Sequence, residues 1–227
     1  MKSQIRSAHR FLVSQSLYPL LLTSLLAGAF FIMRVAYSRR LDYSNLVWNL
    51  FLAWIPYGCS LVAAVWFRLA PRYWFLLLIP SGLWLVFFPN APYIVTDFYH
   101  LGYRPPIPLW YDIGLIAIFA FNGVFLAIAS LRTMHNIVKH YLGWISGWIF
   151  AGIALGLSAL GIYLGRFGRF NSWDLLFHPK AVLKEIAFPL INPFENLGFV
   201  GFTLMFTAIL VVFYLMFMNN ARQDDAG

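Results

Sequence analysis

Six long apolar stretches constrain the fold of this chain more than any other feature of its sequence. They are Leu17–Tyr37, Leu46–Phe67, Tyr73–Phe88 with a continuation toward Val95, Leu109–Leu131, Tyr141–Leu164 and Phe199–Met218. A helix needs about 20 consecutive apolar residues to cross the hydrocarbon core of a bilayer, whereas transmembrane barrels show short segments of alternating polarity. The pattern therefore predicts an all-α integral membrane helix bundle, with about six transmembrane helices in a single domain over residues 1–227.

The composition agrees with a membrane protein and argues against a soluble one. Apolar residues make up 61% of the chain and charged residues 11%, whereas a soluble domain carries about 25% charged residues. The net charge of +8 does not indicate a nucleic-acid partner, because the basic residues flank the apolar stretches, where lysine and arginine meet lipid phosphates. The expected partners are membrane lipids.

The N-terminus raises the question of a cleaved signal peptide. Lys2, Arg6 and Arg10 precede the first apolar stretch, and residues 27–29 (Ala-Gly-Ala) resemble a cleavage site. The apolar stretch nevertheless continues through Met33, beyond the usual end of a signal-peptide core. We therefore expect a retained first helix.

An even number of spans places both termini on one side of the membrane. The sixteen basic residues divide equally between the two sides, so the positive-inside rule does not decide the orientation. Six acidic residues lie on the side opposite the termini, where they can pair with arginines. On this ground we expect both termini to be cytoplasmic.

The third apolar stretch ends in FFPNAPYIVTDFYH, residues 87–100. Pro89 and Pro92 each remove a backbone donor, and proline disfavours a helical conformation at the residue before it. Asn90 can satisfy the backbone groups that the prolines free. The sequence therefore predicts a third helix that breaks near the membrane interface, with irregular backbone that must be buried in protein or face water.

The long connection at residues 165–198 contains a second local signal. In residues 180–188 (KAVLKEIAF), apolar residues gather on one helical face and Lys180, Lys184 and Glu185 on the other. This pattern is typical of a short helix in the membrane interface.

A cluster of polar residues falls on the membrane side opposite the termini. It consists of Asn90, Asp97, His100, Asp112, Arg166, Arg169, Asn171 and Asp174. Ionisable groups within a membrane need partners, and the simplest pairs join Asp97 or Asp112 to Arg166 or Arg169. Such a pair would fix the third, fourth and fifth helices to one another.

Three functional interpretations of the same cluster remain open. Carboxylates and imidazoles are metal ligands, and the candidates are Asp97, His100, Asp112, Asp174 and His178. The same groups can perform acid–base catalysis, although the chain has no HExxH, GxSxG or P-loop motif. The arginines can instead hold a lipid phosphate or another anion.

The fifth apolar stretch carries small residues along one helical face. They are Gly143, Gly147, Ala154, Ser158, Gly161 and Gly165. Small residues allow close helix packing in a membrane, so we expect this helix to be central. In the fourth stretch, Asn122 predicts a hydrogen bond between helices, whereas His135 is expected in a solvated loop.

Three segments resemble the signature sequences of a known family. FFPNAPYIVTDFYHL (87–101), PLWYD (108–112) and GRFGRFNSWD (165–174) are similar to those of a family of uncharacterised bacterial membrane proteins, domain of unknown function 1361. The resemblance implies a bacterial inner-membrane location and a chain of about this length. It implies no activity, cofactor or partner.

Three functions are consistent with these observations. The first is a membrane-embedded pocket that binds or transports an anionic solute or lipid headgroup. The second is a structural or accessory subunit of a membrane complex. The third is a metal-dependent interfacial hydrolase. The absence of internal repeats argues against an ordinary secondary transporter, and we favour the first function.

Overall fold

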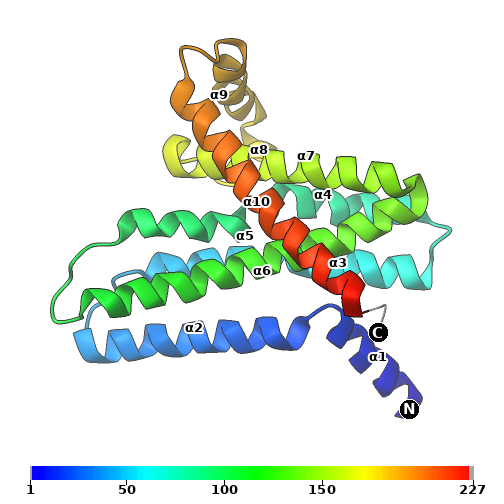
Figure 1. Cartoon of the computed structure of the whole chain (residues 1–227), viewed down its shortest axis with the longest axis horizontal. Coiled ribbons are helices and arrows are strands. Elements are labelled where there is room, and N and C mark those ends of the chain that lie inside the picture. The colour runs from blue at the N-terminus through cyan, green and yellow to red at the C-terminus, as the bar shows by residue number, and fades with distance from the viewer. Residues whose placement is uncertain (1, 225–227) are drawn as a thin grey trace.

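The computed structural model describes residues 2–224, which form a bundle of long helices with a group of short helices beside it (Figure 1). The elements are α1 (Lys2–Ser14), α2 (Leu17–Ser38), α3 (Ser44–Leu69), the 3-10 helix η1 (Trp74–Leu77), α4 (Leu78–Phe87), α5 (Asn90–Tyr93), the 3-10 helix η2 (Ile94–His100), α6 (Leu109–Leu142), α7 (Trp144–Tyr163), the π-helical turn η3 (Leu164–Gly168), α8 (Asp174–Phe177), α9 (Pro179–Ile191) and α10 (Leu197–Asp224).

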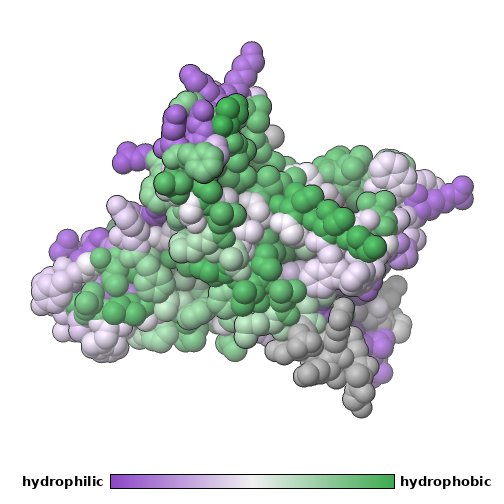
Figure 2. All heavy atoms as spheres, turned by 45° about the horizontal axis from the view of Figure 1, so that its top comes forward, coloured by the Kyte–Doolittle hydropathy of each residue, from purple (hydrophilic) through white to green (hydrophobic). Residues whose placement is uncertain are grey.

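Six segments of the described chain are long and apolar enough to cross a membrane, as predicted. They are α2, α3, the continuous run from η1 to η2, α6, α7 with η3, and residues Leu197–Met218 of α10. Apolar residues cover the middle of the face in Figure 2, and hydrophilic residues gather at its extremities. The chain is therefore an all-α, multi-pass membrane protein. Helix α1 and the C-terminal part of α10 lie near each other at one end of the bundle, which is called the end of the termini below (Figure 1).

The central helix is α6, and the expectation that the fifth span is central was wrong. In the apolar window of α6, 61% of the residues are buried, compared with 39% for α7 and 17% for α2 and α10. Helix α6 packs against α2, α3, α5 and α7. It also runs to Leu142, well beyond the predicted end at Leu131.

His135 corrects a second prediction, because it lies in this C-terminal extension of α6 and not in a solvated loop. Its side chain is buried, and Nδ1 lies 2.8 Å from the hydroxyl of Tyr214 in α10. Asn122 makes the predicted contacts between helices. Its amide donates to Ser24 of α2 at 2.7 Å, and its carbonyl oxygen accepts from Thr23 at 3.0 Å.

The third span is broken where the prolines predict. Helix α4 ends at Phe87, and the chain continues through the single turn α5 into the 3-10 helix η2. The Asn90 amide donates to the carbonyl oxygen of Phe87 at 3.0 Å, so it satisfies a backbone acceptor at the break. The break brings Thr96, Asp97 and His100 to the end of the bundle opposite the termini.

Most of the small residues of α7 lie where other elements approach closely. A methyl group at Gly147 would come within 2.9 Å of the His135 ring, and one at Gly161 within 2.7 Å of Pro89. Ala154 and Ser158 are buried, and Gly165 lies against Tyr93. Gly143 does not belong to this stripe. It forms the turn between α6 and α7 with a φ of 89°, and no side chain or backbone crowds it.

The connection from α7 to α10 contains α8 and α9 and stands beside the bundle (Figure 1). Pro179 begins α9, as expected for a residue without a backbone donor, and the helix runs through Pro189 to Ile191. Val182 is buried, whereas Leu183 and Ile191 are exposed apolar residues. This group of helices covers one side of the pocket described below.

Candidate functional site

Asp97 and Arg166 form the predicted ion pair between the third and fifth spans. Nη2 of Arg166 donates to Oδ1 of Asp97 at 2.8 Å, and both side chains are more than nine-tenths buried. Arg166 also donates to the Thr96 hydroxyl, at 3.0 Å from Nε and 2.7 Å from Nη2, and to Nε2 of His100 at 2.7 Å. Its guanidinium carbon lies 4.7 Å from the ring centre of Tyr93.

Two asparagines of α3 complete this network, and sequence reasoning missed both of them. Asn49 donates to Oδ2 of Asp97 at 2.7 Å, and Asn45 donates to Oδ1 at 3.3 Å. The carboxylate is therefore paired with a cation and hydrogen-bonded through both oxygens. The sequence did contain a signal for them: Asn45 and Asn49 are four residues apart, so their side chains lie on the same face of a helix. We call Asn45, Asn49, Asp97 and Arg166 the first clasp.

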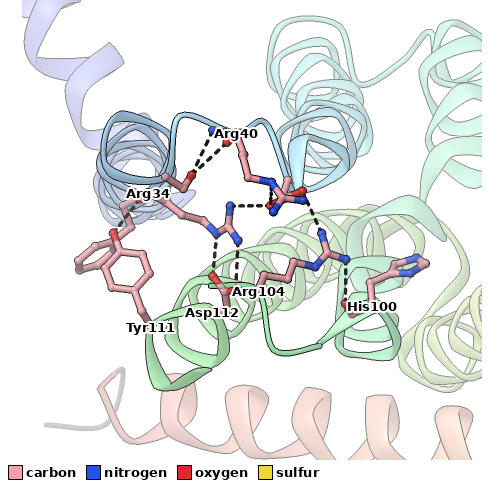
Figure 3. Close-up of polar contacts among 9 residues, drawn as sticks. Arg34, Arg40, His100, Arg104, Tyr111 and Asp112 are labelled. Atoms are coloured by element: carbon pink, nitrogen blue, oxygen red, sulfur yellow. Dashed lines mark hydrogen bonds and ion pairs between the residues drawn. The ribbon is translucent and has the colours of Figure 1, made fainter. Parts of the chain in front are cut away.

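Asp112 pairs with Arg34 of α2 and not, as predicted, with Arg166 or Arg169 (Figure 3). Nε of Arg34 donates to Oδ1 at 2.7 Å and Nη2 donates to Oδ2 at 3.2 Å, and neither side chain is exposed. Asp112 lies in the first turn of α6 at the position where the last turns of α2 pack, so Arg34 reaches it across the helix interface.

We call Arg34 and Asp112 the second clasp. Asp42 links it to the surface. Its carboxylate lies 3.6 Å from Nη1 of Arg34, 3.3 Å from Arg40 and 3.4 Å from Arg104. Arg104 also donates to the backbone oxygen of His100 at 3.5 Å (Figure 3). The two clasps therefore meet at the same end of the bundle, and together they join α2, α3, η2, η3 and α6.

The predicted metal-ligand set is not assembled. Among the residues that the structure describes, no group of three or more His, Cys, Asp or Glu side chains could hold a metal ion. Asp97 and Asp112 belong to separate clasps, each with its own arginine. Asp174, in α8, and His178, directly after it, form a separate pair, in which Nδ1 of His178 lies 3.5 Å from Oδ1 of Asp174.

Beside the first clasp lies a pocket of about 470 Å³ between α3, α4, α7 and the connection that contains α8 and α9. Apolar side chains line most of it, among them Leu52, Phe88, Leu157 and Val182. Trp48, Leu85 and Leu157 are exposed on the outer surface of the bundle. Because they also line the pocket, it opens sideways, toward the region that lipid chains occupy.

The polar lining of the pocket comes mainly from the segment after η3. Arg169, Asn171 and Ser172 line it together with Asn90, whose amide donates to the Ser172 hydroxyl at 2.6 Å. Arg169 adopts a left-handed conformation with a φ of 57°, and its side chain is exposed. Within residues 2–224 it makes no ion pair and no side-chain hydrogen bond.

Ser158 of α7 is a polar group in the pocket wall without a partner. Its side chain is fully buried, and its hydroxyl makes no hydrogen bond in the described part of the protein. A buried hydroxyl without a partner costs about 1–3 kcal/mol. Apart from Asp174, the predicted site residues thus divide into two groups. Asp97, His100, Asp112 and Arg166 hold helices together, whereas Asn90, Arg169 and Asn171 line a pocket.

Comparisons with known proteins agree with the resemblance in the sequence. A family model described as "Protein of unknown function (DUF1361)" matches residues 48–221. This range includes Asn49, Asp97 and Arg166 of the first clasp, Asp112 and every residue of the pocket, whereas Asn45 lies just before it. No curated protein and no solved structure matches the chain. The chain belongs to the DUF1361 family of proteins of unknown function.

Proposed function

We propose that this protein binds an anionic lipid or a similar amphiphile in the pocket between α3, α4, α7 and α9. The observation that carries the proposal is an apolar pocket, open at the side of the bundle, with the unpaired Arg169 in its lining. The acyl chain would lie against Leu52, Leu157 and Val182, and the anionic headgroup would lie at Arg169.

The charge distribution supports an anionic ligand. Arg166 is neutralised by Asp97, so its charge is not available to a ligand. The other nearby carboxylate, Asp174, accepts a hydrogen bond from the backbone nitrogen of Asn171 at 2.6 Å. Arg169 therefore supplies the free positive charge of the pocket, and arginine binds phosphate groups in a bidentate manner.

The ion pair of the first clasp, Asp97 with Arg166, supports the pocket from behind its wall. Asn49 donates to Asp97 and also lines the pocket, and Tyr93 lies between the Arg166 guanidinium and the same cavity. Loss of the clasp would deform one wall of the pocket. The clasp residues are therefore positioning residues in this proposal, and the pocket residues bind.

Titration of the purified protein with lipid tests the proposal. The protein is purified in mild detergent, titrated with phosphatidylglycerol or phosphatidylcholine of the same chain length, and analysed by native mass spectrometry. We expect Arg169→Gln to weaken phosphatidylglycerol binding by about tenfold or more, because a hydrogen bond to a charged group contributes about 1.5–3 kcal/mol.

Arg39→Gln is a matched control. Arg39 is also an exposed arginine at a helix C-terminus, with a φ of 55°, and it makes no ion pair among the described residues. It does not line the pocket. If Arg169→Gln and Arg39→Gln bind phosphatidylglycerol with equal affinity, Arg169 does not hold the headgroup and the proposal fails.

The proposed location is a bacterial inner membrane with both termini in the cytoplasm. Four of the eight basic residues on the far side are held by carboxylates, namely Arg34, Arg40, Arg104 and Arg166. Among the basic residues on the side of the termini whose side chains the structure describes, none makes an ion pair with a carboxylate. A cysteine introduced at Arg72 tests the orientation. Labelling from outside intact cells by a membrane-impermeant reagent would contradict it.

A further inference from the structure

A second pocket, of about 550 Å³, lies at the other end of the bundle, on the side of the termini. It is formed by the turn between α1 and α2 together with α3, α6 and α10. Its apolar lining includes Leu20, Phe67, Phe125 and Phe217. Thr23 also lines it, and the hydroxyl of Thr23 contacts Asn122 halfway along α6. The pocket therefore extends from the end of the bundle toward the middle of the membrane.

Basic and amide groups surround the outer part of this pocket. Arg68 of α3 and Arg132 of α6 both line it, together with Asn136. Among the described side chains, none of these three makes a hydrogen bond or an ion pair. Arg68 instead lies with its guanidinium carbon 4.3 Å from the ring centre of Phe11.

No described carboxylate neutralises these arginines. Six of the eight acidic residues, Asp42, Asp97, Asp112, Asp174, Glu185 and Glu195, lie in elements at or beyond the opposite end of the bundle. Two unpaired cations that face one cavity repel each other, and an anion between them removes this repulsion. The pocket is thus complementary to a negatively charged group at its mouth.

The wall that carries Arg132 is held rigidly. The turn between α1 and α2 is fixed by Tyr57, whose hydroxyl donates to the backbone oxygen of Gln15 at 2.8 Å. The hydroxyl of Thr133, next to Arg132, contacts the side-chain oxygen of Gln15 at 2.6 Å. The pocket is therefore largely formed before a ligand arrives, which lowers the entropic cost of binding.

We infer that this pocket is a second binding site for an anionic phospholipid, in the leaflet opposite the first pocket. The phosphate lies between Arg68 and Arg132, and one acyl chain extends along Leu20 and Phe125. A free phosphate ion would not need the apolar depth of the cavity, so the structure favours a lipid over inorganic phosphate. The inference concerns residues separate from those of the proposed function.

Native mass spectrometry with phosphatidylglycerol tests this second site. The double variant Arg68→Gln/Arg132→Gln should weaken one phosphatidylglycerol site by about 30-fold, because each basic residue near an anionic lipid contributes about a factor of five. Arg72→Gln/Lys139→Gln is the matched control, since it removes the same charge from the same end of the bundle and neither residue lines the pocket. The control should bind as the unmodified protein does.

A second variant blocks the cavity instead of removing the arginines. Ala129 lines the pocket and is half-buried, so Ala129→Phe should fill the cavity and abolish the same site without a change in charge. If the Arg68→Gln/Arg132→Gln variant binds phosphatidylglycerol as tightly as the control does, the inference is overturned. Displacement of phosphatidylglycerol by inorganic phosphate at equal concentration would also overturn it. Arg169→Gln should leave this site unchanged, so the two sites can fail independently.

Discussion

The buried pair of Arg34 and Asp112 should contribute more to stability than any other single ion pair of the described chain. Both side chains are fully buried, and two hydrogen bonds of 2.7 and 3.2 Å join them. A hydrogen bond to a charged group contributes about 1.5–3 kcal/mol. Arg34→Met removes both bonds and leaves the Asp112 carboxylate buried with no other cation, so it should lower the free energy of unfolding by about 5 kcal/mol.

Substitution of the other member of the pair, Asp112, should lower the free energy of unfolding by less. Asp112→Leu leaves Arg34 with Asp42, whose carboxylate remains 3.6 Å from Nη1. We expect a loss of about 3 kcal/mol, at the lower end of the range for a broken buried pair. The double variant Arg34→Met/Asp112→Leu should be more stable than either single variant, because no buried charge is left alone.

Reversible unfolding in mixed micelles with increasing mole fraction of sodium dodecyl sulfate measures these differences. Asp42→Asn is the control. The side chain of Asp42 is 17% exposed and that of Arg40 is 58% exposed, so this substitution should cost about 1 kcal/mol or less. If the effects of the two single substitutions simply add in the double variant, the two side chains are not coupled and the reasoning is refuted.

Three further predictions concern packing and polar contacts within the bundle. Gly123→Ala should lower stability by about 1–3 kcal/mol or more, because the new methyl group would collide with the backbone oxygen of Ala91. Gly152→Ala, which meets open space, should be neutral in the same unfolding assay. Asn122→Leu should cost about 0.6–1.7 kcal/mol, and a larger loss would indicate a role beyond the contacts to α2. His135→Phe should cost about 1 kcal/mol, since it leaves a buried tyrosine hydroxyl of α10 unpaired. Unchanged stability would contradict the hydrogen bond.

Local signals in the sequence predicted the architecture. Long apolar stretches identify the six spans because helix length must match bilayer thickness. The break in the third span follows from Pro89 and Pro92, which act on the backbone within a few residues. The pairing of Asp97 with Arg166 followed from the need of a membrane carboxylate for a cation on the same side.

The partner of Asp112 was not predicted, because the choice depends on which helices are neighbours. Several arginines lie on the same side of the membrane as Asp112, and the sequence does not show which of them is close to it. A usable signal did exist. Arg34 lies inside the predicted span Leu17–Tyr37, and a charge within a span requires a partner. The pockets could not be predicted from the sequence either, because residues from at least five separate elements line each of them.

The end of α6 was placed too early for a related reason. Arg132 and Lys139 interrupt the apolar pattern, although His135 between them is buried. Within this segment the Thr133 hydroxyl donates to Gln15 and His135 contacts Tyr214 of α10. Met134 and Ile137 are buried, so the helix continues because one face still packs. Periodicity alone does not separate such a partly solvated extension from a loop.

The length of α6 has a consequence for the protein in its bilayer. With 34 residues and a rise of about 1.5 Å per residue, the helix extends about 51 Å. A bilayer with its headgroups is about 40–45 Å thick, so α6 must tilt or project into water. Six other elements of the described chain are packed on α6. A change in lipid chain length should therefore tilt or shift these elements together with α6. Thicker and thinner bilayers should therefore move the rims of both pockets relative to the lipid headgroups.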